Sequence, residues 1–490
     1  MNKEILFKAL GQSKTTEQLI TQLLSGDIFS VRGLMGSSLS FVLAQAYLSV
    51  RKPLFFVCND KEEAAYYLND LENFLGQENV LFFPSSYRRP YQVEETDNAN
   101  VLLRAEVLSR LAEPNPNFVI VSYAEALFEK VLTRQQLDKN TLTLKRGEHL
   151  SLDTLNETLF EYQFQRVDFV SEPGEFSVRG GIVDVFSFSN DTPYRIEFFS
   201  DVVESIRTFD VETQLSLQQV SSVVIIPNIE SKVTGEQRTS FLSLLPEETL
   251  IFVQDFELFA PKWEKMYQKA QEAFAALKGE IAHLPPEELF CNAQEGLRDF
   301  AQRYVVRVNP HNPQEIVGKG VSFAMRPQPS FNKRFELLIE HFKEKYNEGY
   351  TNYICCVSAQ QAQRFLDIFE ELHQQVPCEL LELSLSEGFT DTANKINCYT
   401  DHQILERYHK FNIRNGYAKK QAITLKELHQ LTIGDYVTHI DHGIGKYAGL
   451  QKIDIEGKKQ EAIKLIYGDR DVLYVSIHSF HKVSKYNGKD

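Results

Sequence analysis

A glycine- and serine-rich turn near the amino terminus is the first place where the residue types could do chemistry. Gly33, Gly36, Ser37 and Ser38 stand between Ser30-Val31-Arg32 and a helical pattern that begins at Leu39. A phosphate-binding loop cradles phosphates with backbone amides, reaches them with a lysine and holds Mg²⁺ with a hydroxyl. Here a serine stands where the lysine belongs, and the first glycine is displaced. We interpret this segment as a degenerate phosphate loop or an ordinary strand-to-helix turn, and we expect no ATP turnover.

The rest of the sequence supplies no other catalytic pattern. It contains no G-x-S-x-G turn, no H-E-x-x-H motif and no acidic helicase box. The six cysteines and twelve histidines lack the spacing of a zinc site, so we expect reduced core thiols and no metal. Asp184 and Glu197 alternate with apolar residues, which predicts solvated carboxylates on the outer face of a sheet. We therefore expect no catalytic residue in this chain.

Length and charge narrow the class of protein. A chain of 490 residues is long enough for about three to five domains. The net charge of −15 disfavours a non-specific clamp on duplex DNA and favours protein partners. The sequence has no apolar run long enough to cross a bilayer and no signal-peptide pattern at its start. We expect no membrane partner and a cytoplasmic location.

The elements around the glycine-rich turn alternate between strand and helix. Apolar runs at 54–58, 80–84 and 118–121 are separated by helical patterns, which is typical of a parallel sheet covered on both faces. The pattern changes to short strands and turns over 175–209, as in an antiparallel meander. The α/β pattern resumes at 250–253, and residues 330–400 predict a small separate α/β domain.

Two segments carry a specific family resemblance. Residues 174–186, 194–201 and 205–210 resemble the strand pattern R-G-x-x-x-D-x-F followed by Y-R-I-E-F-F that UvrB shares with the transcription-repair coupling factors (Mfd). Residues 434–447 are similar to the opening of the RNA-polymerase-interacting domain of the coupling factors, which UvrB lacks. The chain thus resembles the amino-terminal part of a transcription-repair coupling factor, without the motor domains of that family.

The resemblance implies a function. This part of the family links stalled RNA polymerase to UvrA in transcription-coupled nucleotide excision repair. Its implied partners are UvrA and the polymerase β subunit. Duplex DNA, ATP and Mg²⁺ would bind only to motor domains outside this sequence, so the chain itself needs no cofactor and is not an enzyme. Two alternatives stay open: a UvrB-like ATP-dependent repair subunit, and a DNA-binding module.

The resemblance also implies contact residues. Arg179, Arg195 and Phe199 match positions that bind UvrA, and we expect their truncation to weaken that binding without loss of thermal stability. In the alternative, Phe199 is a core residue and the arginines pair with Glu197 or Asp184. For the polymerase, we expect edge-strand pairing with contacts from Leu450 and Ile453, unless one of these two is core.

The resemblance gives the fold class and a division into domains. We predict a multi-domain α/β protein: a UvrB-like parallel α/β domain with an inserted β-rich UvrA-binding domain, a small α/β domain, and a small carboxyl-terminal β-barrel that is CarD-like. The predicted domains are 1–145 (domain 1a), 146–227 (domain 2), 228–328 (domain 1b), 329–402 (domain 3), 403–430 (linker) and 431–490 (polymerase-interacting domain).

Overall fold

The structure is a computed structural model. It describes residues 4–27, 29–86, 98–188, 190, 192–211, 213–227, 237–276, 284–310, 319–406, 433–439, 443–455, 458–468, 471–476 and 483–485. The chain divides into two units, one of residues 1–139 with 229–414 and one of residues 140–228 with 415–490.

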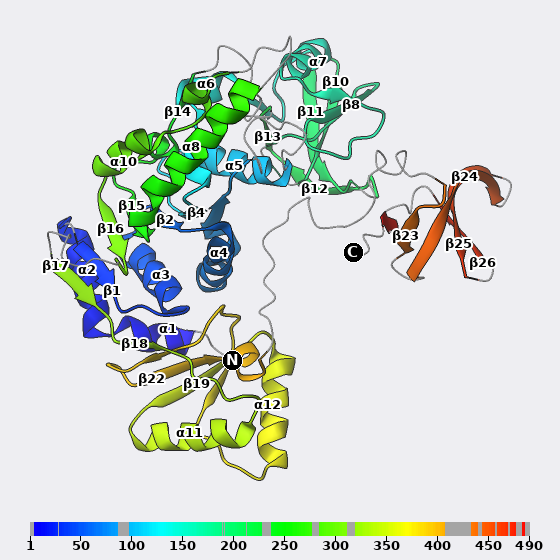
Figure 1. Ribbon diagram of the computed structural model, residues 1–490. Helices are drawn as coiled ribbons and strands as arrows, with labels where there is room; N and C mark the ends of the chain where they lie inside the picture. The colour runs from blue at the N-terminus through cyan, green and yellow to red at the C-terminus, as the bar shows by residue number, and fades with distance from the viewer. Residues whose placement is uncertain are drawn as a thin grey trace. The chain divides into compact units, whose positions relative to one another are not determined.

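A seven-stranded parallel sheet forms the centre of the first unit (Figure 1). Its order is β17-β1-β16-β15-β2-β4-β3, and every neighbouring pair is parallel. The strands are β1 Phe29–Arg32, β2 Leu54–Cys58, β3 Val80–Phe83, β4 Val119–Tyr123, β15 Leu250–Gln254, β16 Val305–Val308 and β17 Lys319–Ser322. Every residue of β2, β3 and β4 is buried, as their continuous apolar sequences predict.

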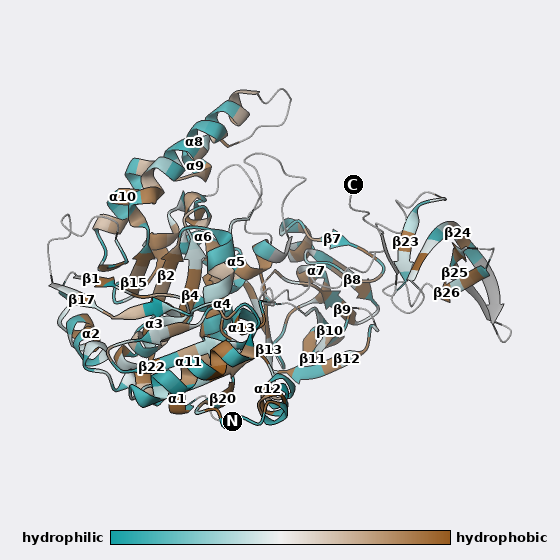
Figure 2. Cartoon of the chain, turned by 60° about the horizontal axis from the view of Figure 1, so that its bottom comes forward, coloured by the Kyte–Doolittle hydropathy of each residue, from teal (hydrophilic) through white to brown (hydrophobic). Residues whose placement is uncertain are grey.

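Helices cover both faces of this sheet. In Figure 2, α8 and α10 lie on one side of the apolar strands, and α2, α3 and α4 on the other. Asp60 begins α4 by accepting hydrogen bonds from the amides of Glu62 and Glu63. The helices of this part are α1 Glu4–Gly11, α2 Lys14–Ser25, α3 Ser38–Val50, α4 Lys61–Leu75, α5 Asn98–Leu111, α6 Arg134–Lys139, α8 Phe259–Ala276, α9 Pro286–Leu289 and α10 Ala293–Ala301. Short 3-10 turns are η1 Gln77–Asn79, η3 Ala126–Phe128, η4 Phe241–Leu244 and η5 Phe256–Leu258, and β5 Val131–Leu132 pairs with β14 Arg238–Thr239.

The same unit contains a second, mixed sheet of order β18-β21-β22-β19-β20. Its strands are β18 Met325–Pro327, β19 Thr351–Cys356, β20 Glu379–Glu382, β21 Phe389–Asp391 and β22 Ile396–Thr400. The helices that accompany it are α11 Phe335–Asn347, α12 Ala359–Glu371 and α13 Asp401–Ile404. Leu338, Phe342 and Phe365 from α11 and α12 pack with Ile354 of β19 in one buried cluster.

The second unit contains a six-stranded sheet of order β12-β11-β10-β9-β8-β7. All its pairs are antiparallel except β7 with β8. The strands are β7 Gln165–Arg166, β8 Glu175–Arg179, β9 Ile182–Val185, β10 Tyr194–Phe199, β11 Val202–Phe209 and β12 Ser216–Val220. Helix α7 (Leu152–Glu161) precedes them, and β6 Leu142–Lys145 pairs with β13 Ser222–Ile225.

The carboxyl-terminal strands form a five-stranded antiparallel sheet of order β26-β25-β24-β23-β27. They are β23 Tyr436–His439, β24 Gly443–Ile455, β25 Lys458–Tyr467, β26 Asp471–Ser476 and β27 Val483–Lys485. Their buried side gathers Val437, Tyr447, Ile463, Leu465 and Val475.

The predicted fold class is confirmed. The described residues contain a parallel sheet, further β-rich sheets, and a carboxyl-terminal antiparallel sheet in the region where the sequence predicted a small barrel. The cysteines are free thiols, as predicted, and all are buried except Cys378, which is half-buried. Among the helices in the described ranges, none combines the length and apolar character that a bilayer crossing needs. The predicted linker lies mostly outside the described residues.

Candidate functional site

The turn between β1 and α3 is shaped by close approach of the protein's own backbone. Gly33 and Gly36 both have positive φ, at +70° and +53°. A Cβ on Gly33 would lie 2.0 Å from the carbonyl oxygen of Phe323, and one on Gly36 would lie 2.8 Å from that of Gly388. These glycines are therefore needed for chain packing, because a side chain at either position would collide with a neighbouring strand or loop.

The amino-terminal end of α3 is occupied by a loop of the small α/β part. The Ser37 amide donates to the Glu387 carbonyl oxygen at 3.1 Å, and the Glu387 amide donates to Ser37 Oγ, also at 3.1 Å. Ser37 Oγ and Ser386 Oγ are hydrogen-bonded at 3.1 Å. We call this arrangement, with Ser40 and Asp70, the α3 socket. In a phosphate loop, the backbone amides at this end of the helix would instead point at the bound phosphate.

Asp70 is the buried centre of the α3 socket. Its carboxylate accepts hydrogen bonds from Ser40 Oγ at 3.0 Å, the Ser386 amide at 2.7 Å and Ser386 Oγ at 2.8 Å. Burial raises the pKa of Asp70, and hydrogen bonds from Ser37 and Ser386 oppose that rise. A phosphate brought here would have to displace residues 386–388 and face this carboxyl group. Ser38 instead bonds within the turn, donating to the Met35 carbonyl oxygen at 2.7 Å.

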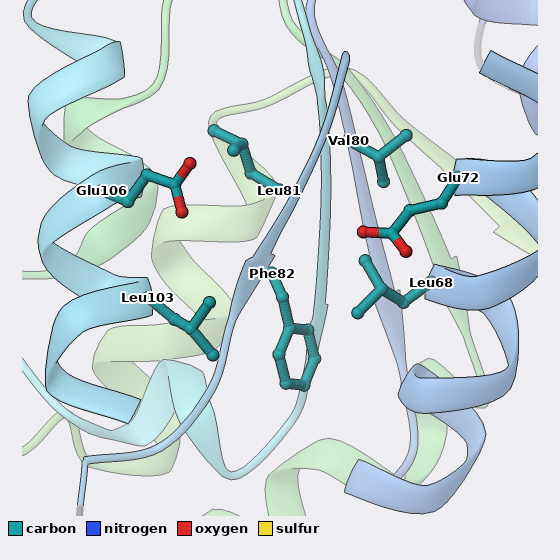
Figure 3. Close-up of a pocket in the computed structure, with 7 residues that line it drawn as sticks. All are labelled: Leu68, Glu72, Val80, Leu81, Phe82, Leu103 and Glu106. Atoms are coloured by element: carbon teal, nitrogen blue, oxygen red, sulfur yellow. The ribbon is translucent and has the colours of Figure 1, made fainter. Parts of the chain in front are cut away.

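A nearby crevice does not offer a ligand site. It lies between α4, β3 and α5, with Glu72 and Leu68 on one side and Glu106 and Leu103 on the other (Figure 3). Its volume of about 10 Å³ is room for no more than about one water molecule. Within the described part of the chain, no group of three or more His, Cys, Asp or Glu side chains is placed to hold a metal ion.

The predicted UvrA-contact residues lie on one side of the six-stranded sheet. Arg195 of β10 stands opposite Asp184 of β9, and Glu197 stands opposite Ile182, which is itself opposite Arg179 of β8. Ile196 and Phe198 are buried on the other side, so Arg195, Glu197 and Phe199 share the outward side as their spacing predicts. We call this outward side the arginine face.

A buried carboxylate holds both arginines of this face. Arg195 pairs with Asp184 through two bonds, Nε to Oδ1 at 2.7 Å and Nη2 to Oδ2 at 2.9 Å. Arg179 pairs with the same Oδ2, and Arg195 Nη1 donates to the Gln214 carbonyl oxygen at 3.1 Å. The hydrogen bonds to Asp184 raise the pKa of Arg195. The Arg195 guanidinium also lies over the buried ring of Phe209, 4.6 Å from its centroid.

The solvation predicted for Asp184 is wrong. The strand alternation placed Asp184 on the correct, outward side, but the two guanidiniums cover it and its side chain is fully buried. Glu197 remains partly exposed, pairs with Arg207, and accepts a hydrogen bond from Ser205 Oγ at 2.6 Å. The Ser205 hydrogen bond first, and Arg207 second, hold the pKa of Glu197 below its usual value.

The three predicted contact residues differ in how much surface they offer. Phe199 is 75% exposed, so it is not the core residue of the alternative interpretation. The side chain of Arg179 is 39% exposed and that of Arg195 only 16%. The alternative is right that both arginines pair with Asp184. Because Arg195 is mostly covered and triply bonded, its truncation should cost stability, contrary to the expectation from the sequence.

The carboxyl-terminal sheet contains the two predicted polymerase contacts. Leu450 is half-buried and packs against the apolar cluster under β23–β26, which favours the alternative that it is a core residue. Ile453 lies in β24 opposite Gln460, but its side chain is outside the described residues. Strand β24 pairs with β23 through residues 443–446 and with β25 through residues 446–455. Tyr447 also exchanges backbone hydrogen bonds with Gly434 and Asp435. Beyond Tyr447, the described strands cover one edge of β24 and leave the other open.

The sequence pattern misplaced Asp184 in solvent, and it did not single out Asp70 or Ser386. Asp184 had an available signal, because the tight Gly180-Gly181 turn fixes the β8–β9 register and brings the carboxylate between two arginines. Asp70 and Ser386 are 316 residues apart, and nothing local in the sequence joins them.

Comparison with known proteins matches two segments of the chain to family models. Residues 142–230 match the UvrB interaction domain, and residues 431–487 match the CarD-like/TRCF RID domain. The first contains the arginine face and the second contains the carboxyl-terminal sheet. The chain therefore combines two interaction modules.

Whole-chain comparison finds similar proteins that match nearly the whole of this chain. The chain is 23% identical to the transcription-repair-coupling factor of Bacillus subtilis over 94% of this chain and 45% of that protein. It is 26% identical to that of Haemophilus influenzae over 89% and 43%, and 25% identical to that of Myxococcus xanthus over 96% and 46%. The chain is a homologue of the transcription-repair coupling factors, which confirms the resemblance found in the sequence. It spans less than half the length of these relatives.

Proposed function

We propose that this chain is the adaptor portion of a transcription-repair coupling factor, linking stalled RNA polymerase to UvrA in nucleotide excision repair. The observation that carries the proposal is the presence of a UvrB interaction domain and a CarD-like/TRCF RID domain in one chain. We further propose the six-part domain division given above and a cytoplasmic location. ATP-driven movement on duplex DNA is proposed for the longer protein, through motor domains outside this sequence.

UvrA is proposed to dock on the arginine face. Phe199 offers a large exposed ring, and Arg179 offers a guanidinium held in one orientation by Asp184. Aromatic and arginine side chains are enriched at interface hot spots, and arginine pairs well with carboxylates of a partner. Arg195 contributes mainly by fixing Asp184.

The polymerase β subunit is proposed to pair with the open edge of β24. Main-chain pairing needs free N–H and C=O groups along an edge, with alternate side chains for specificity. Ile453 remains our candidate contact, whereas the half-buried Leu450 is better suited to support the strand. Ile453→Arg should abolish polymerase binding without unfolding the sheet. Binding at the parent affinity would reject this assignment.

We propose that the chain neither binds nor hydrolyses ATP and needs no cofactor. The degenerate loop lacks its lysine, and residues 386–388 hold the amide end of α3. The UvrB-like enzyme alternative depends on turnover at this loop, so ATP hydrolysis that copurifies with the chain and needs Mg²⁺ would favour that alternative instead.

A bridging assay tests the adaptor function directly. Immobilised UvrA should retain RNA polymerase only when the 490-residue chain is added. Phe199→Ala should remove both the chain and the polymerase from the beads. Ile453→Arg should leave the chain bound and remove the polymerase alone. Retention of polymerase by UvrA to the same extent without the chain would refute the proposal.

A further inference from the structure

We propose that Phe169 is a second aromatic contact of the arginine face, so that UvrA docks across Arg179 between two exposed phenylalanines. This inference rests on the proposed UvrA-binding function and deepens it. It assigns the direct contacts to Phe169, Arg179 and Phe199, and assigns Asp184 and Arg195 to positioning.

The location of Phe169 makes it part of the same surface. It follows β7, on the far side of β8 from β9 and β10. Ser177 Oγ donates to the Asp168 carbonyl oxygen at 3.0 Å, which ties the segment to β8. The guanidinium of Arg179 lies over the Phe169 ring, 5.3 Å from its centroid. Phe199 ends β10, two strands away on the other side of Arg179.

The surface is hollowed beside Phe169. A depression of about 530 Å³ has Phe169, Ser177 and Arg179 along its walls, with polar and apolar groups both present. Phe169 is 57% exposed. An exposed aromatic ring beside a guanidinium and a hollow is suited to receive an apolar side chain of a partner together with a nearby carboxylate.

The charges of the arginine face leave Arg179 available to an acidic group of a partner. The face carries three arginines (Arg179, Arg195 and Arg207) and three carboxylates (Glu175, Asp184 and Glu197), on a chain whose net charge is −15. Glu175 accepts hydrogen bonds from the amides of Ser171 and Glu172, both at 2.8 Å. Asp184 is buried, and Glu197 is paired with Arg207. Arg179 therefore stands between the two exposed rings as a held cation, and a carboxylate of UvrA is its matching group.

Arg195 acts through Asp184 instead of through the partner. Two of its bonds go to Asp184, one goes to the Gln214 carbonyl oxygen, and Phe209 covers one side of its guanidinium plane. The side chain of Arg195 is only 16% exposed, so little of its surface can contact a partner. Its role is to keep Asp184 in place, and Asp184 in turn orients Arg179.

The experiment measures the affinity of UvrA for the 490-residue chain by biolayer interferometry, with thermal unfolding in parallel. Phe169→Ala should weaken binding at least about tenfold with an unchanged unfolding temperature, and Phe169→Tyr should bind like the parent. Phe160→Ala is the matched control. Phe160 is 51% exposed and packs on Phe176, whose side chain lies on the opposite side of β8, so its loss should leave affinity unchanged.

A double-mutant cycle sharpens the test. Because Phe169 and Arg179 touch, Phe169→Ala with Arg179→Ala should weaken binding less than the product of the single effects. If Phe169→Ala binds like the parent while Phe199→Ala and Arg179→Ala lose binding, this inference is overturned and the proposed function stands. If the parent chain does not bind UvrA, both fail.

Discussion

The α3 socket and the arginine face are each organised by a buried aspartate, and they differ in the groups that bind to that aspartate. Asp70 accepts hydrogen bonds from serine hydroxyls and a backbone amide of the chain itself. Asp184 instead holds two guanidiniums, and one of them reaches the surface. A carboxylate that binds serine hydroxyls and a backbone amide uses those donors within the fold and closes the site. A carboxylate that binds arginine side chains leaves their remaining N–H groups available to a partner. The motif that resembles a nucleotide site is thus the closed one.

The largest expected effect of a single substitution is the loss of the Asp184 carboxylate. Asp184→Ala leaves the positive charges of Arg179 and Arg195 without their buried counter-ion. Removing one partner of a buried ion pair costs about 3–5 kcal/mol. Urea unfolding of the full chain should show this loss in the transition of the second unit. Asp184→Asn, which keeps the shape, should cost less. A cost under about 1 kcal/mol for the alanine variant would mean that the arginines rearrange freely.

Phe199→Ala tests whether the arginine face binds a partner, since it should change UvrA affinity and leave stability unchanged. The exposed ring contributes little to folding, so the unfolding temperature should not change. Truncating an interface hot spot costs at least about 2 kcal/mol, or roughly thirtyfold in UvrA affinity. Isothermal titration of UvrA against the variant and the parent measures the difference. Equal affinities would remove Phe199 from the contact.

Ser386→Ala tests the closed site. It deletes the hydroxyl that bonds to both Asp70 and Ser37, while the backbone amide bond to Asp70 remains. We expect a loss of about 1–2 kcal/mol in the free energy of unfolding of the first unit, because a buried acceptor keeps some of its donors. UvrA affinity should be unchanged. A loss of UvrA binding in this variant would show that the two places are coupled.

The smallest expected effect is a pH dependence at Asp70. Burial raises its pKa in the folded state above the unfolded value, so the folded state holds the proton more strongly. The contribution of Asp70 to stability is therefore greatest below its unfolded pKa and falls as pH rises through the folded pKa. Urea unfolding of the parent and Asp70→Asn should be compared from about pH 3.5, below the ordinary aspartate pKa, up to about pH 7.5. The free energy of unfolding of the parent should fall relative to that of the variant as pH rises. A constant difference would contradict the sign of the shift.

Local pattern was enough to predict most of the fold. Continuous apolar runs marked β2, β3 and β4, and paired turns marked the meander from β8 to β11. Alternation also predicted which side of the sheet carries Asp184 and Phe199. Alternation does not say what covers a side chain, and for this reason the burial of Asp184 was missed.

The parts of the site that escaped prediction depend on distant contacts. Ser386 reaches Asp70 from 316 residues away, and the ring of Phe169 meets Arg179 only because a loop folds back beside β8. The motif match named Arg179, Arg195 and Phe199 together, without separating the exposed residues from the mostly covered one. That separation needs the bonds of Arg195 to Asp184 and Gln214, which come from the three-dimensional register of the strands.

The order of strands in the parallel sheet has a consequence for synthesis on the ribosome. Strand β1 is near the amino terminus, yet its two neighbours are β16 and β17, which follow the whole 140–228 segment in the chain. At roughly 5–20 residues per second, β1 waits about 15 to 60 s for its partners. The six-stranded sheet pairs mostly consecutive strands and can close long before then. A nascent chain would thus carry a folded arginine face while β1 of the parallel sheet still lacks its neighbouring strands. We expect the need for chaperones to be greatest during that interval.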